Sequence, residues 1–242
     1  MNLLLLTPDE AADQPTVLTD RRATHIVETL RAKVGDTLRA GILNGPTGLA
    51  TVRAIETSGV TIEATCEDAP PPPGENTLLL AVPRPIVLRR CLASAAALGY
   101  GRVALFRTRH VDKSHLGAKV MEPANIREHL IDGLSQARRT HVPDVHLFPR
   151  FKPIVEDEIE GLAPKGPRFV AHPDAERDIA QLQFARSEPF TVALGPERGF
   201  TDYEVDLFTT KGFEPIHTGR HPLRVETALA VITGQLDLLR RI

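Results

Sequence analysis

Short apolar runs separated by turn residues fill the first seventy positions of the chain. The turns include Asn44-Gly45-Pro46 and Ser58-Gly59, which interrupt runs of strand length. In chain order we expect a strand in the opening MNLLLL, a helix over Ala23–Ala32, and strands over Leu38–Leu43, Leu49–Ile55 and Val60–Ala64. Several short strands with one helix predict a small β-barrel over residues 1–70.

The pattern changes after the proline run Pro70–Pro73, which is followed by Gly74. Four prolines cannot continue a helix or a central strand, so this stretch is expected to link two domains. Beyond it, continuous apolar runs alternate with amphipathic stretches. The expected strands are Thr77–Val82, Val103–Phe106, Val145–Phe148, Phe169–Ala171 and Thr191–Leu194, and the expected helices are Pro85–Leu98, Glu122–Arg139, Thr201–Thr210 and Glu226–Arg241. This alternation predicts an α/β domain over residues 75–242, with a mostly parallel sheet covered on both faces.

Composition is that of an ordinary globular protein, with one locally basic segment. Hydrophobic residues make up 42% of the chain and charged residues 25%, and the net charge is −2. Between Arg84 and Lys152, however, thirteen Lys and Arg residues accompany only five acids. This local excess fits a face that meets phosphates, and it also fits a set of solvated helix faces.

Cysteine usage and hydropathy indicate neither an exported nor a membrane-bound protein. Cys66 and Cys91 are too few for a disulfide framework or a zinc site, and the histidines lack a metal-ligand spacing, so we expect no metal. No apolar run approaches the roughly 20 residues that span a bilayer. The N-terminal run lacks the basic flank of a signal peptide. We therefore expect a cytoplasmic protein.

Two loops combine glycine, proline and charged residues where ligands usually bind an α/β sheet. The first, Gly195–Thr201, follows an expected strand, and Thr201 and Glu204 have the spacing of a capping box that begins a helix. The second, His217–Ala228, carries two arginines and a glutamate into the C-terminal helix. Taken singly, the first loop can be a simple turn, and the second can be an arginine–carboxylate pair tying a loop to a helix.

Taken together, these loops resemble motifs of the SPOUT RNA methyltransferases, in particular the family of ribosomal RNA small subunit methyltransferase E. Gly195–Phe200 matches a Gly-Pro-Glu-Gly-Gly-Phe loop, and Gly219 with Leu223–Ala228 matches a Leu-Gly-x-x-x-Leu-Arg-x-Glu-Thr-Ala segment. Upstream, His25–Asp36, Thr108–Val111 and Ser135–Pro143 are similar to further family signatures. The resemblance therefore covers nearly the whole chain.

The resemblance implies a PUA-like, RNA-binding barrel followed by a trefoil-knotted α/β domain that binds S-adenosylmethionine. It also implies a homodimer with the active site near the subunit interface. The substrate of this family is N3 of a uridine in 16S ribosomal RNA of the small ribosomal subunit. The implied cofactor-binding residues are His172, Leu194, Gly195, Pro196, Glu197, Gly199, Ile216, Thr218, Gly219 and Leu223.

Several positions depart from the family pattern. Arg198 replaces the first glycine of the family's Gly-Gly pair, and Arg220-His221-Pro222 replaces its Pro-Arg-Ile. The usual N-terminal Arg-aromatic start is absent, and the helix Pro85–Leu98 lacks the expected acidic and lysine positions. These departures weaken the prediction of which nucleotide is methylated, but they do not change the predicted reaction class, methyl transfer.

Methylation at N3 requires loss of the uracil imide proton and stabilisation of the resulting anion. Arg224 is our candidate for stabilising the anion, because a guanidinium donates to two oxygens at once. Glu197 and Glu226 are candidate bases, although Glu226 can instead orient Arg224, and His217 and His221 compete for the role.

RNA binding is expected to rely on basic side chains that contact phosphates. The expected residues are Arg21, Arg22, Arg31 and Lys33 in the barrel and Arg107, Arg109, Lys113, Arg138 and Arg139 in the second domain. With nine Phe and two Tyr residues, an extensive base-stacking platform is not expected, so the shape of a folded rRNA site would provide specificity.

Three alternatives remain open. The first is another SPOUT enzyme acting on tRNA or on a ribose hydroxyl. The second is a non-catalytic ribosome-assembly factor, which Arg198 and the altered 220–222 segment would favour. The third is a phosphate-handling enzyme, disfavoured because the chain has no P-loop lysine and no metal-binding acid cluster.

Overall fold

The computed structural model describes the whole chain except residues 164–165, 184, 186–187, 220 and 242. It divides into two compact units, Met1–Pro73 with Ile131–Val142, and Gly74–Leu130 with Pro143–Ile242. The boundary at Pro73 and Gly74 falls in the proline run, which forms neither helix nor strand. Residues 131–142, expected within the second domain, lie in the first compact unit. Local patterning identified their helix but carries no information on which core the helix joins.

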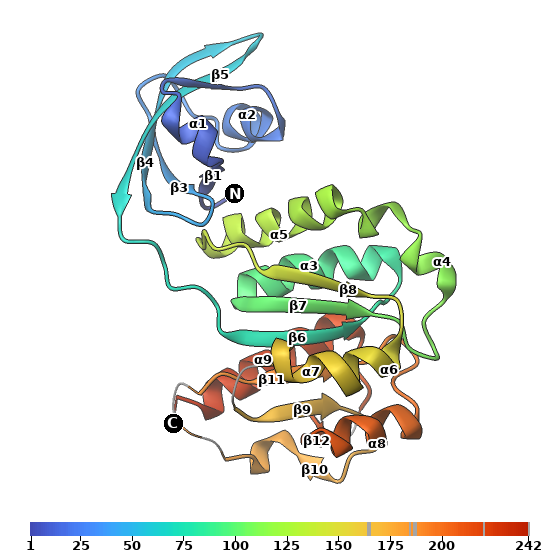
Figure 1. Ribbon diagram of the computed structural model, residues 1–242. Helices are drawn as coiled ribbons and strands as arrows, with labels where there is room; N and C mark the ends of the chain where they lie inside the picture. The colour runs from blue at the N-terminus through green and yellow to red at the C-terminus, as the bar shows by residue number, and fades with distance from the viewer. Residues whose placement is uncertain (164–165, 184, 186–187, 220, 242) are drawn as a thin grey trace. The chain divides into compact units, whose positions relative to one another are not determined.

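The first unit contains one five-stranded mixed sheet in the order β1-β3-β4-β5-β2 (Figure 1). The β1–β3 pair is parallel, and the pairs β3–β4, β4–β5 and β2–β5 are antiparallel. The expected barrel is thus a curled half-barrel. Its elements are β1 (Leu4–Leu6), α1 (Pro8–Ala12), β2 (Thr16–Leu18), α2 (Arg21–Thr24), the π-helix η1 (His25–Thr29), β3 (Thr37–Ile42), β4 (Thr47–Glu56) and β5 (Gly59–Asp68).

The core of this unit forms where alternating apolar side chains of the strands meet the buried face of the short helices. Leu6, Val52 and Ile62 from the sheet and Ile26 from η1 are fully buried together. Two elements escaped prediction, α1 and β2, because each is too short to show a period. The start of α1 has a clear local cause, since Thr7 and Glu10 form a reciprocal capping box with proline at the first position.

The second unit is built on a seven-stranded, entirely parallel sheet in the order β10-β12-β9-β11-β6-β7-β8. Its burial explains the near-continuous apolar runs, since all six residues of β6 are buried. This sheet confirms the predicted α/β class. The strands are β6 (Asn76–Ala81), β7 (Tyr100–Phe106), β8 (Asp144–Phe148), β9 (Arg168–Ala171), β10 (Arg177–Asp178), β11 (Thr191–Leu194) and β12 (Phe213–His217).

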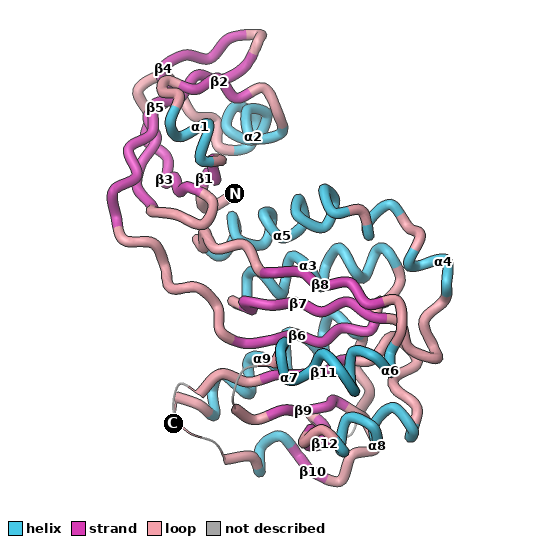
Figure 2. The backbone as a smooth tube through the Cα atoms, in the orientation of Figure 1, coloured by secondary structure: helices cyan, strands magenta, loops and turns pink. Residues whose placement is uncertain are grey.

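Helices cover both faces of this sheet (Figure 2). On one face α3 packs against α9, and on the other α6 and α8 meet around Phe208, whose ring lies 5.3 Å from those of Phe151 and Phe200. The helical segments are α3 (Pro85–Leu98), α4 (Lys113–Leu116), η2 (Lys119–Met121), α5 (Pro123–Ala137), α6 (Phe151–Pro153), η3 (Ile154–Glu158), α7 (Ile159–Leu162), η4 (Ile179–Gln181), α8 (Asp202–Thr210) and α9 (Val225–Leu239).

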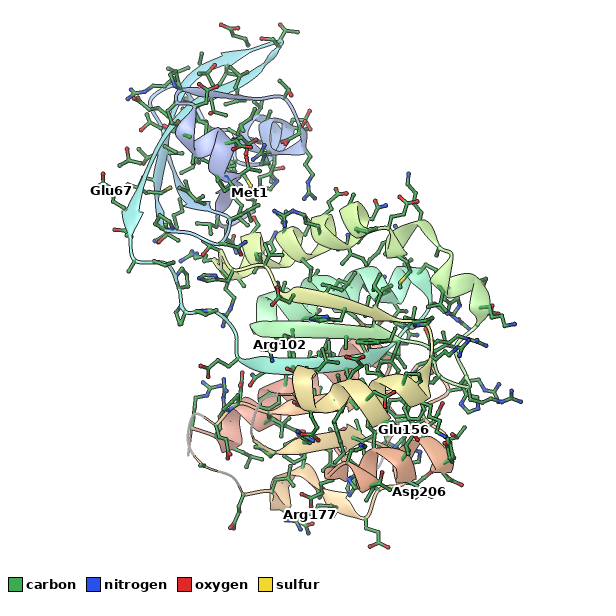
Figure 3. All side chains as sticks on the ribbon, viewed as in Figure 1. Met1, Glu67, Arg102, Glu156, Arg177 and Asp206 are labelled. Carbon is green, nitrogen blue, oxygen red and sulfur yellow. The ribbon has the colours of Figure 1, made fainter. Side chains whose placement is uncertain are left out.

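Side-chain hydrogen bonds attach the end of α7 to the sheet. The Leu162 carbonyl accepts from Nη1 of Arg102 at 2.9 Å and from Oγ1 of Thr77 at 3.2 Å, so one acceptor joins β6 and β7 to this helix. Arg102 is labelled on β7 in Figure 3. Two elements differ from the sequence-based expectations. The helix expected over Ala23–Ala32 is α2 followed by a π-helical turn. The strand β12 was not expected, because Pro215 interrupts its strand pattern.

Candidate active site

Four neighbouring strands end at the same edge of the parallel sheet. In spatial order these are β12, β9, β11 and β6, so the loops that follow them are brought together although they lie far apart in sequence. The chain runs outward through β6, β7 and β8 and then returns to the other half of the sheet at β9. Ligands bind open α/β sheets at such a switch point, outside the carboxyl ends of the strands.

A pocket of about 330 Å³ occupies this edge. The strand ends after β9, β11 and β12 form its walls, and the first turns of α9 close it through Val225, Ala228 and Ile232. The structure brings together in this one pocket all ten residues that the resemblance implied for the cofactor: His172, Leu194, Gly195, Pro196, Glu197, Gly199, Ile216, Thr218, Gly219 and Leu223.

The loop after β11 is shaped by two glycines. A Cβ on Gly195 would lie 2.9 Å from the Phe200 nitrogen and 3.0 Å from the Gly199 Cα, so no other residue fits there without moving the loop. Gly199 has φ +69°, and its N–H donates to the Pro196 carbonyl at 2.8 Å, closing the turn. The buried Phe200 ring then anchors the end of the loop among the aromatic side chains beneath it.

Arg198 fits this turn because the left-handed conformation falls on the next residue. Its backbone φ is not positive, unlike that of Gly199. The side chain is exposed and lines the pocket. The departure from the family's Gly-Gly pair therefore requires no backbone strain and adds a cation to the pocket wall. Of the other departures, His221 and Pro222 line the pocket, and Arg220 lies outside the described residues.

The loop after β12 uses a histidine to hold its own backbone. The Gly219 N–H donates to Nδ1 of His217 at 3.1 Å, so that nitrogen carries a lone pair and the proton of the neutral ring is on Nε2. The Asp178 carboxylate is 4.0 Å from the same Nδ1, too far to form a hydrogen bond with it. His217 thus organises the pocket wall, and in this tautomer its one lone pair is already used by the Gly219 N–H, so none is free to accept a substrate proton.

Glu197 lines the pocket, as do the candidate bases His217 and His221, whereas Glu226 is not among the lining residues. Oε1 of Glu197 accepts a hydrogen bond of 2.9 Å from the backbone N–H of Arg84, the residue that precedes α3. Burial raises the pKa of the Cys91 thiol on α3 to about 12, with further contributions from Glu226 and Glu197. The hydrogen bonds place both carboxylates at α3, Glu197 at the residue before the helix and Glu226 at Arg90 within it.

Glu226 does not orient Arg224 as the sequence suggested. Its Oε1 accepts from Nη1 of Arg90 on α3 at 3.3 Å, and the side chain is only 17% exposed. Arg224 is the exposed residue that precedes α9, between the pocket-lining Leu223 and Val225. The short spacing of these two residues suggested a local pair, but the partner comes from a helix more than a hundred positions away.

Arg84 and Arg90 contact the two candidate carboxylates, but neither is among the predicted site residues. Their place in the fold indicates the site, because Arg84-Pro85 follows β6, and β6 lies next to β11 in the sheet. That adjacency, however, depends on the strand order, which local patterns do not specify.

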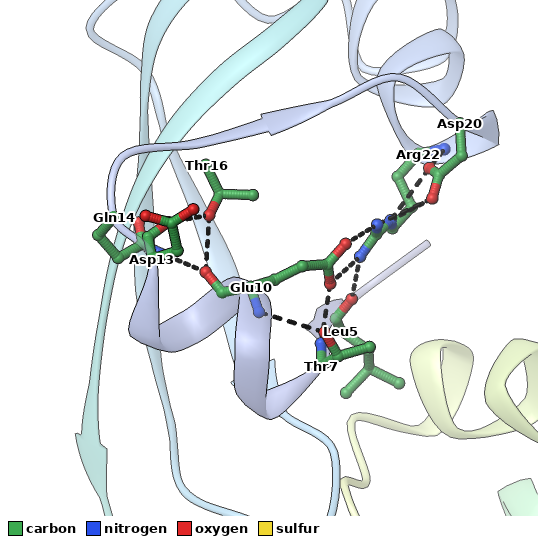
Figure 4. Close-up of polar contacts among 8 residues, drawn as sticks. All are labelled: Leu5, Thr7, Glu10, Asp13, Gln14, Thr16, Asp20 and Arg22. Carbon is green, nitrogen blue, oxygen red and sulfur yellow. Dashed lines mark hydrogen bonds and ion pairs between the residues drawn. The ribbon is translucent and has the colours of Figure 1, made fainter.

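Arg22, predicted to bind RNA, is committed to structural contacts in the first unit (Figure 4). Its guanidinium donates to both carboxylate oxygens of Asp20, to the Leu5 carbonyl and to the Glu10 carboxylate. The hydrogen bond from Arg22 is also the main cause that holds the pKa of Glu10 below its ordinary value of 4.5. The donors of Arg22 are therefore used within the fold, where they join three segments of the first unit.

The other predicted RNA contacts divide between the two units. Arg138 and Arg139 belong to the first unit, with Arg21, Arg31 and Lys33, and not to the second domain as expected. Arg21 forms an ion pair with Asp132. In the second unit, Arg109 and Lys113 are exposed and Arg107 is half-buried; all three follow β7.

Neither a metal centre nor a membrane span emerges from the described part of the chain. No group of three or more His, Cys, Asp or Glu side chains among these residues is arranged to hold a metal ion. No helix among them combines the length and apolar character needed to cross a bilayer.

Comparison with known proteins agrees with this geometry. Residues 70–237 match the family model described as an RNA methyltransferase domain. Ribosomal RNA small subunit methyltransferase E of Treponema pallidum is 30% identical over 233 residues, covering 94% of this chain and 87% of that protein. Ribosomal RNA small subunit methyltransferase E 1 of Borreliella burgdorferi is 26% identical, covering 94% of each chain.

A solved structure has the same fold over nearly the whole chain. It is ribosomal RNA small subunit methyltransferase E of Neisseria gonorrhoeae bound to S-adenosyl methionine, with a TM-score of 0.77, 19% identity and 98% coverage of each chain. The seven-stranded parallel sheet, the strand-end pocket and the matching domain model define an RNA methyltransferase of the SPOUT class. Within that class, the chain belongs to the ribosomal RNA small subunit methyltransferase E family.

Proposed function

We propose that this protein transfers the methyl group of S-adenosylmethionine to N3 of a specific uridine in 16S ribosomal RNA. The observation that supports this most strongly is the single pocket formed by the loops after β9, β11 and β12 and closed by α9. It gathers the ten residues implied for the cofactor, in a chain whose family acts on small-subunit rRNA. Residues 1–70 would bind RNA and residues 75–242 would carry the methyltransferase site.

The residues of the pocket suit S-adenosylmethionine. Leu194, Ile216 and Leu223 provide apolar walls for an adenine ring, and the strand-end loops offer backbone hydrogen-bonding groups. Asp174 and Arg198 line the same pocket, so groups of both charge signs are present for a ligand with a sulfonium, an ammonium and a carboxylate. Gly195 allows the loop to close tightly, and a Cβ at that position would clash with it.

The proposed roles of the chain in methyl transfer are to align the base, accept its proton and stabilise the uracil anion. When bound, S-adenosylmethionine supplies an electrophilic methyl group. Arg224, exposed between two pocket-lining residues, would donate to the uracil carbonyl oxygens. Glu197 is the favoured acceptor of the N3 proton, because its carboxylate lines the pocket, whereas Glu226 is held by Arg90 and the lone pair of His217 is used by the Gly219 N–H. His221, which also lines the pocket, is the remaining alternative.

Two of the proposed RNA contacts occupy backbone positions where glycine is usual. Arg31 follows the end of η1 and Arg138 follows the end of α5, with φ of 53° and 57°. A non-glycine residue in this left-handed conformation costs about 1–2 kcal/mol, so glycine would be the more stable choice. The presence of an exposed arginine at both of these less stable positions supports a role for the side chains outside the fold.

Substitutions in the first unit should separate its structural arginine from its RNA contacts. Arg22→Ala should lower the free energy of unfolding by about 2–3 kcal/mol, because it leaves Glu10 and Asp20 without their shared donor. Since the pKa of Glu10 is lowered in the folded state, its contribution is full above pH 4.5 and is lost at lower pH. Urea unfolding at pH 7 and pH 4 measures both effects.

The matched control is Lys33→Ala at an exposed position of the same unit. It should leave stability unchanged, weaken RNA binding and reduce the slope of log K against log salt concentration by about 1. A stable Arg22→Ala variant with the same reduction in slope would return Arg22 to the RNA face.

We also propose that the protein is a cytoplasmic homodimer with its active site near the subunit interface. The second unit has exposed apolar side chains, including Leu223 at the pocket and Leu238 on α9. Such side chains support an interface with a second copy of the chain. Light scattering tests the oligomeric state, because it should give the relative molecular mass of a dimer.

The function is tested by transfer of labelled methyl groups from S-adenosylmethionine to small ribosomal subunits from cells that lack this protein. Nucleoside mass spectrometry should find the label as 3-methyluridine. Label in another nucleoside would overturn the N3 assignment. Cofactor binding without transfer to any ribosomal or transfer RNA would favour the assembly-factor alternative.

A further inference from the structure

A buried carboxylate connects two loops at the edge of the sheet. Glu204 lies in the first turn of α8 and is only 3% exposed. Its Oε2 accepts from the Thr201 N–H at 2.9 Å, at the end of the loop after β11. Its Oε1 accepts from the Arg109 N–H at 2.8 Å, in the loop after β7. One side chain therefore holds two segments that lie about ninety positions apart in sequence.

His110 makes a second connection between the same loops. Its Nδ1 lies 3.1 Å from the carbonyl oxygen of Gly199, and because a carbonyl only accepts, this nitrogen must carry the proton. Gly199 is the left-handed residue of the pocket loop. The loop after β7 is thus attached at both its Arg109 amide and its His110 ring.

The two connected loops have different proposed partners. The loop after β11 lines the cofactor pocket, and the loop after β7 carries the half-buried Arg107 and the exposed Arg109, two of the proposed phosphate contacts. From this arrangement we infer that Glu204 and His110 are positioning residues for methyl transfer, which set the RNA-contacting loop relative to the cofactor loop. This inference rests on the proposed function. Neither residue needs to touch the cofactor to act in this way.

The chemistry of the link requires a carboxylate at position 204. Both groups that it binds are backbone N–H donors, and a carboxylate has acceptor atoms on both sides. A glutamine of the same shape has only one acceptor oxygen, and its amide group would face the second donor. Because glutamine also serves in a capping box, its oxygen is expected to keep the bond to the Thr201 N–H. Glu204→Gln should therefore break the connection to the Arg109 N–H while retaining the packing of the side chain.

The capping box of α8 supplies a matched control. Oγ1 of Thr201 accepts from the Glu204 N–H at 3.3 Å, so Thr201→Ala weakens the same helix start. It leaves both bonds accepted by the Glu204 carboxylate in place, because their donors are backbone groups. Comparison of the two variants separates loss of the helix cap from loss of the loop connection.

The experiment combines hydrogen exchange with kinetics on the full chain. In Glu204→Gln, exchange of peptides covering 107–112 should increase, while Thr201→Ala should leave it unchanged. At saturating S-adenosylmethionine and small subunits, kcat should fall about 100-fold in Glu204→Gln, because a misplacement of about 1 Å has that effect, with less than threefold change in cofactor Kd. His110→Ala should lower kcat, and His110→Asn, which retains a donor near Nδ1, should restore part of it.

The two readouts distinguish failure of this inference from failure of the proposed function. If wild-type protein transfers no methyl group but exchange responds as expected, the connection stands and the assigned reaction is wrong. If exchange and kcat change equally in Glu204→Gln and Thr201→Ala, Glu204 only caps α8 and the inference is overturned. If exchange responds but kcat does not, the connection has no role in positioning.

Discussion

Replacement of Arg224 by alanine should reduce methyl transfer about 100-fold while leaving the affinity for S-adenosylmethionine nearly unchanged. Arg224 is exposed between the pocket-lining Leu223 and Val225, and the structure pairs Glu226 with Arg90. The guanidinium is thus available to a substrate anion, and loss of one such donor commonly costs a factor of 10² to 10³ in kcat. Single-turnover transfer and calorimetric binding of the cofactor measure the two quantities.

Arg224→Lys is the matched control for charge. Lysine retains the positive charge but lacks the planar pair of donors, so its activity should lie between those of wild type and Arg224→Ala. Equal kcat in wild type and Arg224→Ala would remove Arg224 from the mechanism. A parallel loss of cofactor affinity and rate would instead assign it to the pocket wall.

Replacement of Gly195 by alanine should weaken cofactor binding roughly 10- to 100-fold. The added Cβ would lie 2.9 Å from the Phe200 nitrogen and 3.0 Å from the Gly199 Cα and carbonyl carbon, all of them backbone atoms. The loop must move to accept it, at a cost of about 1–3 kcal/mol, which corresponds to that range in Kd. Calorimetric titration with S-adenosylmethionine gives the result directly.

Two other glycines separate the effect of the clash from a general effect of alanine. Gly199→Ala meets no atom within 4 Å but must retain φ +69°, so its effect should be smaller, up to about tenfold. Gly161→Ala on α7 also has open space and has no positive φ, and it should leave binding unchanged. If all three variants bind the cofactor equally well, the loop after β11 does not shape the cofactor site.

Much of the fold could be predicted from local patterns. The helix Pro85–Leu98 and the strand Thr191–Leu194 have the predicted bounds, and the capping box at Thr201 begins α8 as expected. Each carries its own signal, in the form of a proline start with a glycine end, a continuous apolar run, or a Thr-x-x-Glu spacing. Elements without such a signal were missed, including β12, whose pattern is interrupted by Pro215.

The candidate site was predictable where its residues are adjacent along the chain. The segments 195–199 and 216–223 could be chosen from their glycines, prolines and family motifs, and the structure brings their described residues, which exclude 220, into one pocket. Pairings between distant segments were not predictable. Arg90 with Glu226 and Arg109 with Glu204 both depend on which strands and helices are neighbours.

By itself the sequence determined the types of the longer elements, the α/β class and the family, because propensity, periodicity and short motifs are properties of neighbouring residues. Only the tertiary structure decided that Arg22 is held by Glu10 and Asp20, that residues 131–142 join the first unit, and that Glu204 connects two loops. The physical reason is that a charged side chain has the same local pattern whether its donors meet solvent, RNA or a buried partner. Its role depends on which groups the folded chain places around it.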